Sequence, residues 1–371
     1  MYHHALYALL SLSLFFDAKS SVIVTKELLP DLEKNSCFSF SKSWHYTAPT
    51  FSLASEPEWI SQVPGAYALS LKNTSVYGTH GVVLVGDKIL QDSLWIWSPL
   101  YRAPHDIFPI PKAQKLKGTL ATIALEGSSN YYHWMIEILP RIHLLKTSGF
   151  AFDFLYTCPL RYCFQKETLA ALGIKKEQII ESTPATHLAP DRLIFPSQAA
   201  RSCVTPQWVI NFLKDTFLKD YIPKNSKKRI FVSRSHSSIR HIVNEDEIFA
   251  LVEPYGFKKV YLEKMSVTEQ ARLIHESEII IGTHGAGMVN IVFATPGTVI
   301  IELFQEHLDS TFFELSTTME LQYHCVKTER IPELSQENVD IRYKNTFIEI
   351  EKLKRTLIPL LEKITHTPPS L

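Results

Sequence analysis

The 371-residue chain is 45% hydrophobic and 20% charged, a composition typical of folded globular protein and long enough for about two domains. Lysine plus arginine and aspartate plus glutamate each number 38, so a formal net charge of zero excludes a global field that would hold nucleic acid or an anionic membrane. We therefore expect any anion to be bound locally. The five cysteines include no Cys-x-x-Cys pair, which argues against a disulfide framework and a structural zinc site, and we expect them to be mostly reduced and buried.

The first apolar run, residues 5–16, is too short to span a bilayer but long enough for the core of a signal peptide. No lysine or arginine precedes it, and Asp17-Ala18 does not complete an Ala-x-Ala cleavage site. Two interpretations stay open: a cleaved signal, or a buried or interfacial segment of the first domain.

The first half of the chain is irregular and rich in proline and aromatic residues, so its topology is not assignable from the sequence. A helix is predicted from Asn130 through Lys146, because breakers are absent except at Pro140. A second helix, 166–172, is followed by Gly173, the residue type favoured just past a helix end. Strand-like runs lie at 67–71, 81–85, 93–97, 154–156 and 192–195.

From Thr205 onward the pattern becomes regular. Thr205-Pro206 predicts a helix N-cap followed by proline at the first helical position, and the polar stretch 223–228 is the predicted linker. Apolar strands then alternate with helices, which indicates a parallel sheet covered on both faces, with its ligand at the carboxyl ends of the strands. The predicted strands are 229–232, 258–262, 279–281 and 298–303.

Two helix starts of this region carry capping signals. Ser266 with Glu269 is a predicted capping box, and Asn244 with Glu247 is a second candidate, each cap worth about 1 kcal/mol. A further helix is expected after Gly285.

Residues 277–290 combine an apolar strand, a glycine-rich turn and the start of that helix. Three of the 13 glycines, Gly282, Gly285 and Gly287, fall within six positions, where the backbone bends sharply and lies close to a ligand. Unpaired N–H groups and the positive end of the helix dipole favour a phosphate there. A plain strand-to-helix turn has the same sequence pattern. The residues around it are therefore needed to distinguish a phosphate site from such a turn.

Polar and charged residues follow each predicted strand, and the carboxyl ends of parallel strands meet at one edge. Arg234 and Arg240 are permanent cationic donors suited to a pyrophosphate, and Glu302 is an acceptor for the hydroxyl pair of a ribose. The alternatives are a surface pair of arginines and an edge salt bridge at Glu302. His284 either bonds a sugar hydroxyl or phosphate or fixes the turn. The residues after the strands are Ser233, Arg234, Ser235, Glu263, Thr283, His284 and Glu302.

Several blocks occur in a distinctive order. They are Arg229-Ile-Phe-Val-Ser-Arg-Ser235, Gly282-Thr-His-Gly-Ala-Gly-Met-Val-Asn290, Val299-Ile-Ile-Glu-Leu-Phe304 and, upstream, Asn130-Tyr-Tyr-His-Trp-Met-Ile-Glu137 with Pro140. These blocks resemble the family 61 glycosyltransferases, in which Asn, His and an acidic residue keep the same spacing before a proline. No single block is decisive, but their order and spacing are specific over residues 130–304.

The resemblance implies an α/β GT-B fold, in which two Rossmann-like domains face an interdomain cleft. It implies an inverting transfer from a nucleotide sugar, usually a UDP-sugar, to a glycan or to a lipid- or protein-linked acceptor. The expected domains are 1–204 on the acceptor side, 205–340 for the nucleotide sugar, and 341–371 as a C-terminal helix that can pack back on the first domain. Nucleic acid is not an expected partner, and peripheral membrane association is compatible with this class.

No Asp-x-Asp element occurs, the carboxylate pair with which metal-dependent GT-A enzymes hold Mn²⁺ or Mg²⁺. We therefore expect no cofactor and no metal. Arg234, Arg240 and the backbone of Gly285-Ala286-Gly287 would instead stabilise the UDP leaving group as negative charge develops.

An inverting displacement needs a base that removes the proton of the acceptor hydroxyl, and histidine suits that task. His133 is our candidate, because His133, Glu137 and Arg141 at i, i+4 and i+8 share one helical face and Glu137 can orient the imidazole. Two alternatives remain: Glu137 is itself the base, or Asn130, His133 and Glu137 merely brace a helix terminus against the second domain.

Two other function classes compete: a catalytically inactive nucleotide-sugar or carbohydrate-binding module, and an NAD-dependent oxidoreductase. The second fits poorly, because Asn290 stands where a dinucleotide fingerprint needs a small residue. Family 61 members occur in bacterial surface-polysaccharide synthesis and in the eukaryotic secretory route. The poor signal flank and a lone glycan acceptor pattern at Asn73 favour a bacterial, cytoplasmic or membrane-peripheral protein, with the secretory lumen as the alternative.

Overall fold

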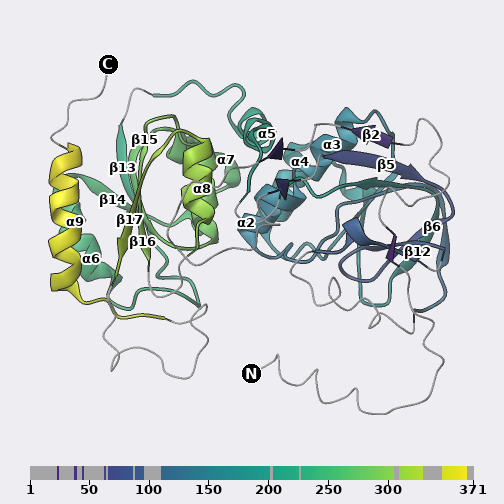
Figure 1. Cartoon of the computed structure of the whole chain (residues 1–371), viewed down its shortest axis with the longest axis horizontal. Coiled ribbons are helices and arrows are strands. Elements are labelled where there is room, and N and C mark those ends of the chain that lie inside the picture. Colours follow the sequence, from purple (N-terminus) through teal and green to yellow (C-terminus); the bar gives the residue numbers. More distant parts are fainter. Residues whose placement is uncertain are drawn as a thin grey trace, which may run out of the picture.

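A computed structural model shows a mixed α/β protein with two large sheets and helices packed around them (Figure 1). The structure describes residues 66–86, 88–95, 110–200, 204–224, 227–304, 309–328 and 345–365, and the backbone of short strands at 23–24, 37–39, 44–45 and 62–63. The α/β class is therefore as predicted. The apolar run 5–16, Trp97, Cys203 and residues 330–344 lie outside the described residues.

The first sheet has ten strands in the order β1-β8-β7-β6-β12-β9-β10-β11, with β5 beside β12 and β2 beside β5. Its centre is parallel, because β12 pairs in parallel with β9, β9 with β10, and β10 with β11. Strands β5 and β6 run antiparallel to β12. This half is thus a mixed sheet and not the all-parallel sheet of a Rossmann unit. The strands are β1 Ile23–Val24, β2 Cys37–Ser39, β5 Tyr67–Leu71, β6 Thr74–Tyr77, β7 Val82–Val85, β8 Lys88–Leu90, β9 Gln114–Thr122, β10 Phe154–Thr157, β11 Ile179–Glu181 and β12 His187–Pro196. Two further strands, β3 Trp44–His45 and β4 Gln62–Val63, pair only with each other.

The predicted strands at 67–71, 81–85, 154–156 and 192–195 are confirmed within a few residues. The predicted strand at 93–97 is not: Gln91–Ser93 form a single 3₁₀ turn, because the hydroxyl of Ser93 donates to the carbonyl of Leu90 at 2.6 Å and closes the chain on itself.

The predicted helix from Asn130 is divided into three parts. Helix α2 (Tyr131–His133) passes into a π-helical stretch (Trp134–Ile138), and α3 (Arg141–Thr147) begins after Pro140. Proline has no N–H for the ladder, which explains the break, and π turns are frequent at functional sites. Helix α4 (Cys163–Ala171) follows, with Gly173 in the left-handed region at φ 75°.

The second sheet is wholly parallel, in the order β14-β13-β15-β16-β17. Its register continues without a break from Ile279 opposite Val299 to Thr283 opposite Leu303, which brings the carboxyl ends of β13, β15 and β16 to one edge. The strands are β13 Lys228–Val232, β14 Phe257–Val260, β15 Ser277–Thr283, β16 Val299–Phe304 and β17 Gln322–Lys327.

Helices cover both faces of this sheet, as the continuous apolar strands predict. On one face α6 (Glu245–Val252) and α9 (Ile350–Thr365) pack against Phe231, Ile279 and Ile301. On the other, α7 (Val267–His275) and α8 (Thr311–Thr318) pack against the alternate residues such as Ile280 (Figure 1). Because α9 lies on the second sheet, the expectation that the C-terminal helix packs back on the first domain is wrong.

Only one of the predicted caps forms. Ser266 accepts from the N–H of Glu269, whose carboxylate accepts from the N–H of Ser266, as the capping box predicts. Asn244 instead donates to and accepts from the backbone of Ile348 at 2.9 Å, so its side chain holds the segment before α9. At α5 (Gln207–Phe217) the N-cap is Pro206 and not Thr205, and no side chain caps it.

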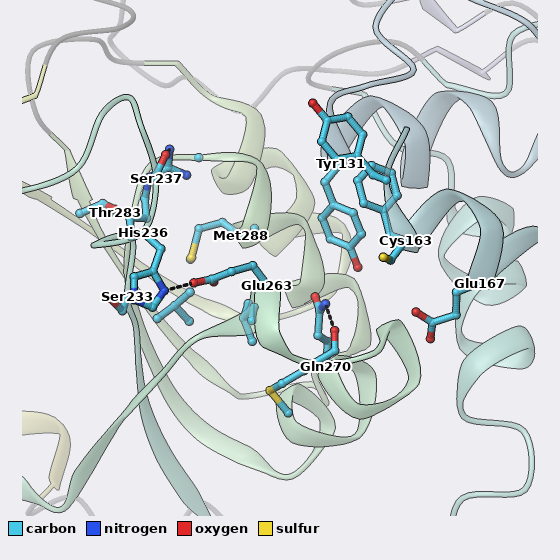
Figure 2. A pocket seen from close by; sticks show the side chains of 18 residues that line it. Tyr131, Cys163, Glu167, Ser233, His236, Ser237, Glu263, Gln270, Thr283 and Met288 are labelled. Atoms are coloured by element: carbon cyan, nitrogen blue, oxygen red, sulfur yellow. Dashed lines mark hydrogen bonds and ion pairs between the residues drawn. The ribbon is translucent and has the colours of Figure 1, made fainter. Parts of the chain in front are cut away.

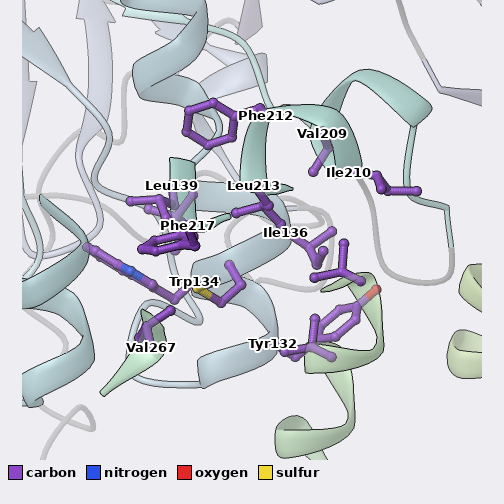
Figure 3. Close-up of a cluster of buried hydrophobic side chains, with 14 of the residues drawn as sticks. Tyr132, Trp134, Ile136, Leu139, Val209, Ile210, Phe212, Leu213, Phe217 and Val267 are labelled. Carbon is purple, nitrogen blue, oxygen red and sulfur yellow. The ribbon is translucent and has the colours of Figure 1, made fainter. Parts of the chain in front are cut away.

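One hydrophobic cluster joins the two halves of the chain. Figure 3 shows side chains of the α2 region around Trp134 packed with those of α5, and with Val267 of α7. Trp134 is buried, and its indole donates to Thr168 at 2.9 Å. The shared core fixes α2 and α4 against the second sheet, where the cavity described below opens.

The described cysteines Cys158, Cys163 and Cys325 are free thiols. Cys158 is buried as expected, but Cys163 and Cys325 are exposed, so the prediction of burial is wrong for these two.

Candidate functional site

A cavity of about 590 Å³ lies between the carboxyl edge of the second sheet and the helices α2 and α4 of the first half (Figure 2). This volume is in the range of small-molecule sites, and the position is the one expected of a ligand in an open parallel sheet. Five of the nine predicted donor-binding residues line the cavity: Ser233, Arg234, Thr283, Gly285 and Gly287.

The loop after β13 is organised by a buried carboxylate. Glu245 accepts from the hydroxyl of Ser233 at 2.5 Å and from the N–H of Arg234 at 2.8 Å, and Lys259 lies 3.5 Å from it. Because Glu245 stands at the first turn of α6, it also complements the helix dipole. The loop therefore has a fixed conformation that directs the Arg234 side chain.

The guanidinium of Arg234 is held from behind by three acceptors. Nε donates to the carbonyl of Arg240 at 3.3 Å, and Nη2 donates to the carbonyl of Ile239 and the hydroxyl of Ser237, each at 3.1 Å. Nη1 is the part turned to the glycine turn. Burial lowers the pKa of Arg234 to about 10, and the nearby charge of Arg240 acts in the same direction, so the side chain is still a cation at neutral pH.

Gly285 is the point of closest approach between the two loops. A Cβ on this residue would lie 2.6 Å from Cζ of Arg234 and overlap its Nη1. The φ of Gly285 is 165°, extended backbone open to any residue, so this close approach, and not backbone strain, requires glycine here. A Cβ on Gly282 would meet Sδ of Met288 at 2.5 Å, so the flexible Met288 side chain would have to shift.

The helix predicted after Gly285 is present as a 3₁₀ helix, Ala286–Phe293. Its N-terminal N–H groups still begin at the cavity, since Gly285 and Gly287 line it. Thr283, at the end of β15, is buried and lines the same cavity, and its hydroxyl has no hydrogen-bond partner among the described residues. A buried polar atom without a partner is uncommon in folded proteins and marks a position where a ligand can supply the bond.

His284 faces away from this cavity and lies in a network of charges. Its Nδ1 donates to Glu302 at 2.7 Å and its Nε2 to Asp309 at 3.0 Å, and the hydroxyl of Tyr323 donates to Glu302 at 2.6 Å. Burial lowers the pKa of His284, but the bonds to Asp309 and Glu302 outweigh it and raise the pKa to about 9. Burial raises the pKa of Glu302. His284 is thus an imidazolium clamped between two carboxylates.

This network bears on two predictions. Glu302 is fully buried, bonds His284 and Tyr323 and does not line the cavity, so of its two interpretations the geometry favours the salt bridge over the ribose contact. Of the two interpretations of His284, the geometry favours the one in which it fixes the turn. Arg240 and Ala286 are also outside the cavity lining, and Arg240 contributes through its carbonyl to Arg234 and adopts a left-handed φ of 53°.

His133 and Glu137 form the predicted pair. Nδ1 of His133 donates to Oε1 of Glu137 at 3.0 Å, and the indole of Trp95 donates to Oε2 at 3.0 Å. Trp95 also meets the His133 ring edge-on, 5.0 Å between centroids. Glu137 is buried in the π-helical stretch, so both of its oxygens are held and the imidazole is oriented through its Nδ1 side.

Asn130 and Arg141 have structural contacts. The Asn130 side chain caps α2 by accepting from the N–H of Tyr132 at 2.9 Å. Arg141 is buried and donates to the carbonyls of Pro196 and Ala124, whereas Glu137 bonds His133 and Trp95. The π turn and Pro140 change the helical phase between residues 134 and 141, so the i, i+4, i+8 spacing does not by itself place Arg141 beside the other two.

The two functional regions meet at the seam between the halves. Tyr132 contacts His133 and Phe312 edge-on, and Phe312 contacts the ring of His284 at 5.3 Å. On the other side of α2 the hydroxyl of Tyr131 donates to Asn290 of the 3₁₀ helix at 3.0 Å. Helix α2 therefore lies between the His133 pair and the cavity.

The first half contributes a part of the cavity wall that no local sequence pattern connects with the second sheet. These residues lie on α2 and α4, or directly before α4, and only the three-dimensional arrangement brings them to the second sheet (Figure 2). No signal in the sequence joins them to the glycine turn. The residues are Tyr131, Tyr162, Cys163, Phe164 and Glu167.

Across the described ranges no cluster of three or more His, Cys, Asp or Glu side chains has a metal-binding arrangement, and in the His284 network both ring nitrogens already bond carboxylates. Within the part of the chain that the structure describes, none of the helices combines the length and apolar character of a membrane crossing.

Comparison with known proteins assigns the region that holds these features. Residues 131–301 match the family model described as Glycosyltransferase 61. This match, over just under half of the chain, is consistent with a family 61 glycosyltransferase. The match includes His133, Glu137, Arg234 and the glycine turn, and it supports a glycosyltransferase.

Individual relatives are similar over shorter stretches. A beta-1,2-xylosyltransferase from Arabidopsis thaliana is 33% identical over 99 residues, 23% of this chain and 18% of the relative. An EGF domain-specific O-linked N-acetylglucosamine transferase from Drosophila melanogaster is 28% identical over 106 residues, 28% of this chain and 20% of the relative. An alpha-1,3-arabinosyltransferase from Oryza sativa subsp. japonica is 33% identical over 91 residues, 24% of this chain and 15% of the relative. The matched stretches thus span a fifth or less of these relatives, which come from plants and an animal and give no support to a bacterial origin.

Proposed function

We propose that this protein is an inverting glycosyltransferase that moves a sugar from a UDP-sugar to a hydroxyl of a glycan or of a protein- or lipid-linked acceptor, without a metal ion. The observation that carries the proposal is the packing of the Arg234 guanidinium on the backbone of Gly285, at the carboxyl edge of a parallel sheet and in a cavity of nucleotide size. A fixed cation beside main-chain N–H groups is suited to a diphosphate.

The arrangement of the two halves supports a GT-B type of architecture. The cavity has one wall from the second sheet and one from α2 and α4 of the first half, as expected where a donor-binding and an acceptor-side domain face each other. The first sheet is mixed, so its likeness to a Rossmann unit is confined to the parallel strands β9, β10, β11 and β12.

In the proposed reaction the acceptor oxygen attacks the anomeric carbon as the bond to the UDP oxygen breaks. Nε2 of His133 takes the acceptor proton, and Glu137 stabilises the imidazolium that forms, because it already holds Nδ1 at 3.0 Å. The electron pair of the broken bond goes to the β-phosphate of UDP, next to Arg234. Both oxygens of Glu137 are occupied by His133 and Trp95, which favours His133 over Glu137 as the base.

Positive charge at the cavity comes from Arg234, which is fixed by its three acceptors, and this supports a mechanism in which the protein stabilises the leaving diphosphate itself. The sequence also has no Asp-x-Asp element. Addition of EDTA should leave transfer unchanged within about twofold under this proposal.

The test is nucleotide release from a panel of UDP-sugars in the presence of glycan acceptors. The relatives' names give the first donors to try: UDP-xylose, UDP-N-acetylglucosamine and UDP-arabinose. We expect acceptor-dependent UDP release from at least one of them. Tight UDP binding without release under any condition would favour the alternative, an inactive nucleotide-sugar-binding module.

The type of acceptor indicates the cellular compartment in which the protein acts. EGF-domain proteins are the acceptors in the name of one relative, so a protein-linked acceptor, and with it the lumen of the secretory pathway, becomes the favoured alternative to a bacterial cytoplasm. Fluorescence microscopy of the tagged protein in its own cell type tests this directly.

A further inference from the structure

Three aromatic rings form the wall of the cavity that the first half contributes (Figure 2). Tyr162 and Phe164 stack in parallel, with ring centroids 5.5 Å apart and planes 6° from parallel. Tyr131 meets Phe164 edge-on at 5.0 Å. We refer to Tyr131, Tyr162 and Phe164 as the aromatic wall.

The aromatic wall is fixed from behind and open in front. Phe164 contacts Trp134 of the shared core at 6.2 Å, and Tyr131 is held by its hydrogen bond to Asn290. The backbone N–H of Tyr162 donates to Gln165 at 3.0 Å, and the buried amide of Gln165 also donates to the carbonyl of Ser128. Tyr162 is nevertheless 47% exposed, which is unusual for a large aromatic residue whose backbone is held so firmly. A fixed ring with an open face is a stacking platform for a flat ligand group.

The charges of the cavity distinguish its two ends. Figure 2 shows Glu167 on the same side as Tyr131, and Ser233 and Thr283 on the opposite side. Arg234 directly follows Ser233, and its guanidinium lies against Gly285, two residues after Thr283. A diphosphate is repelled by a carboxylate and attracted by the guanidinium, so it belongs at the Arg234 end. The aromatic wall is left for an uncharged, flat part of the ligand.

The position of His133 indicates which uncharged part of the ligand lies against the aromatic wall. Tyr131 and His133 are two residues apart on α2, so they point about 200° apart around the helix, and His133 does not line the cavity. The sugar to be transferred and the acceptor must reach His133, on the other side of α2. From a diphosphate at Arg234, the aromatic wall is therefore in the direction of the nucleoside.

We propose that the aromatic wall binds the nucleobase of the donor, with the base stacked on Tyr162 and with Leu262 and Met265 of the second half completing an apolar slot. Both of these residues line the same cavity. The base site would thus be assembled from both halves of the chain, so that the first half takes part in donor binding. This inference rests on the proposed function, because it assumes a nucleotide in the cavity.

The test compares UDP with inorganic pyrophosphate as ligands in calorimetric titrations of the full chain. In the variant Tyr162→Ala we expect UDP to bind about 5- to 100-fold more weakly, the effect of losing one base-stacking contact, with the affinity for pyrophosphate unchanged. Tyr162→Phe keeps the ring and should restore UDP affinity to within about twofold. Ile222→Ala truncates a side chain that is 85% exposed and outside the cavity, and serves as the control.

The outcomes separate the two claims. If the unmodified protein binds neither UDP nor a UDP-sugar, the proposed function itself fails. If it binds UDP, and Arg234→Ala weakens both ligands while Tyr162→Ala changes neither, the donor site stands and the nucleobase assignment is overturned. An unchanged UDP affinity together with a raised KM for the acceptor in Tyr162→Ala would overturn it as well, and would show that the aromatic wall binds the acceptor.

Discussion

The guanidinium of Arg234 lies so close to the backbone of Gly285 that a methyl group at residue 285 would occupy its place. Three acceptors hold the guanidinium there, so it cannot turn away without losing hydrogen bonds to Ser237, Ile239 and Arg240. The two loops that follow β13 and β15 are therefore matched to each other. This relationship is the physical basis of the proposed diphosphate site.

Gly285→Ala should displace Arg234 and weaken UDP binding. Hydrogen bonds to charged groups contribute about 1.5–3 kcal/mol each, so the loss of one corresponds to about 10- to 100-fold in Kd. Calorimetric titration with UDP measures it. Gly287→Ala is the matched comparison, because its Cβ would meet only Leu262, at 3.9 Å. A smaller effect for Gly285→Ala than for Gly287→Ala would contradict the account.

His133→Ala should lower kcat by about 10²- to 10⁴-fold, the usual contribution of a positioned base, and leave the Kd for UDP nearly unchanged. Glu137→Gln keeps an acceptor for Nδ1 and should retain more activity than His133→Ala. Steady-state rates of UDP release with a saturating acceptor measure both. If Glu137→Gln is the more damaging variant, Glu137 is the base.

Trp95→Phe tests the support of that pair. The change removes the indole donor to Glu137 but keeps a ring beside His133, so we expect kcat to fall by about tenfold with an unchanged Kd for UDP. The pH profile of kcat should shift as well, because Glu137 would lose a bond that fixes it against His133. An unaltered rate and profile would show that Trp95 only packs there.

The His284 network predicts a loss of stability at alkaline pH. The pKa of His284 is raised to about 9 in the folded chain, from 6.5 in the unfolded chain, so the stabilisation is complete below pH 6.5 and is lost as the pH rises through about 9. The shift corresponds to at most about 3 kcal/mol, because burial also raises the pKa of Glu302 and offsets part of it. Urea unfolding from pH 6 to pH 9.5 measures it, and His284→Gln should remove this pH dependence. Equal slopes in both proteins would show that His284 is not charged.

Arg141→Met should act on stability and not on catalysis. The variant leaves the carbonyls of Pro196 and Ala124 without their buried donor, and we expect a loss of about 2–6 kcal/mol in the free energy of unfolding, since each unsatisfied buried carbonyl costs about 1–3 kcal/mol. The KM values of the folded fraction should be unchanged. A raised acceptor KM at unaltered stability would restore Arg141 to the acceptor site.

The second half of the fold was predictable because the hydrophobic pattern, the helix caps and the order of the elements all indicate the same parallel sheet. Runs such as 279–281 and 298–303 are apolar throughout, the capping box at Ser266 starts a helix, and a parallel sheet places its ligand at a known edge. Arg234 and Gly285 were found by that rule. Both residues follow a strand of a parallel sheet, and the order of strands and helices in the sequence was enough to predict that they lie at its carboxyl edge.

The errors have a physical origin as well. A helical wheel drawn through Glu137 and Arg141 assumes a constant period, which the π turn and Pro140 break. Glu302 looked available because it ends a strand, but its partners Tyr323 and Asp309 come from later segments that no local pattern connects with it. The aromatic wall was missed for the same reason: Tyr162 meets the second sheet only through the shared core.

The structure of the protein crystallised with UDP tests the central claim most directly. We predict the diphosphate within hydrogen-bond distance of the Arg234 guanidinium and of the backbone N–H groups at 285–287. A nucleotide bound elsewhere on the chain, or an Arg234 side chain turned away from the diphosphate, would contradict the account.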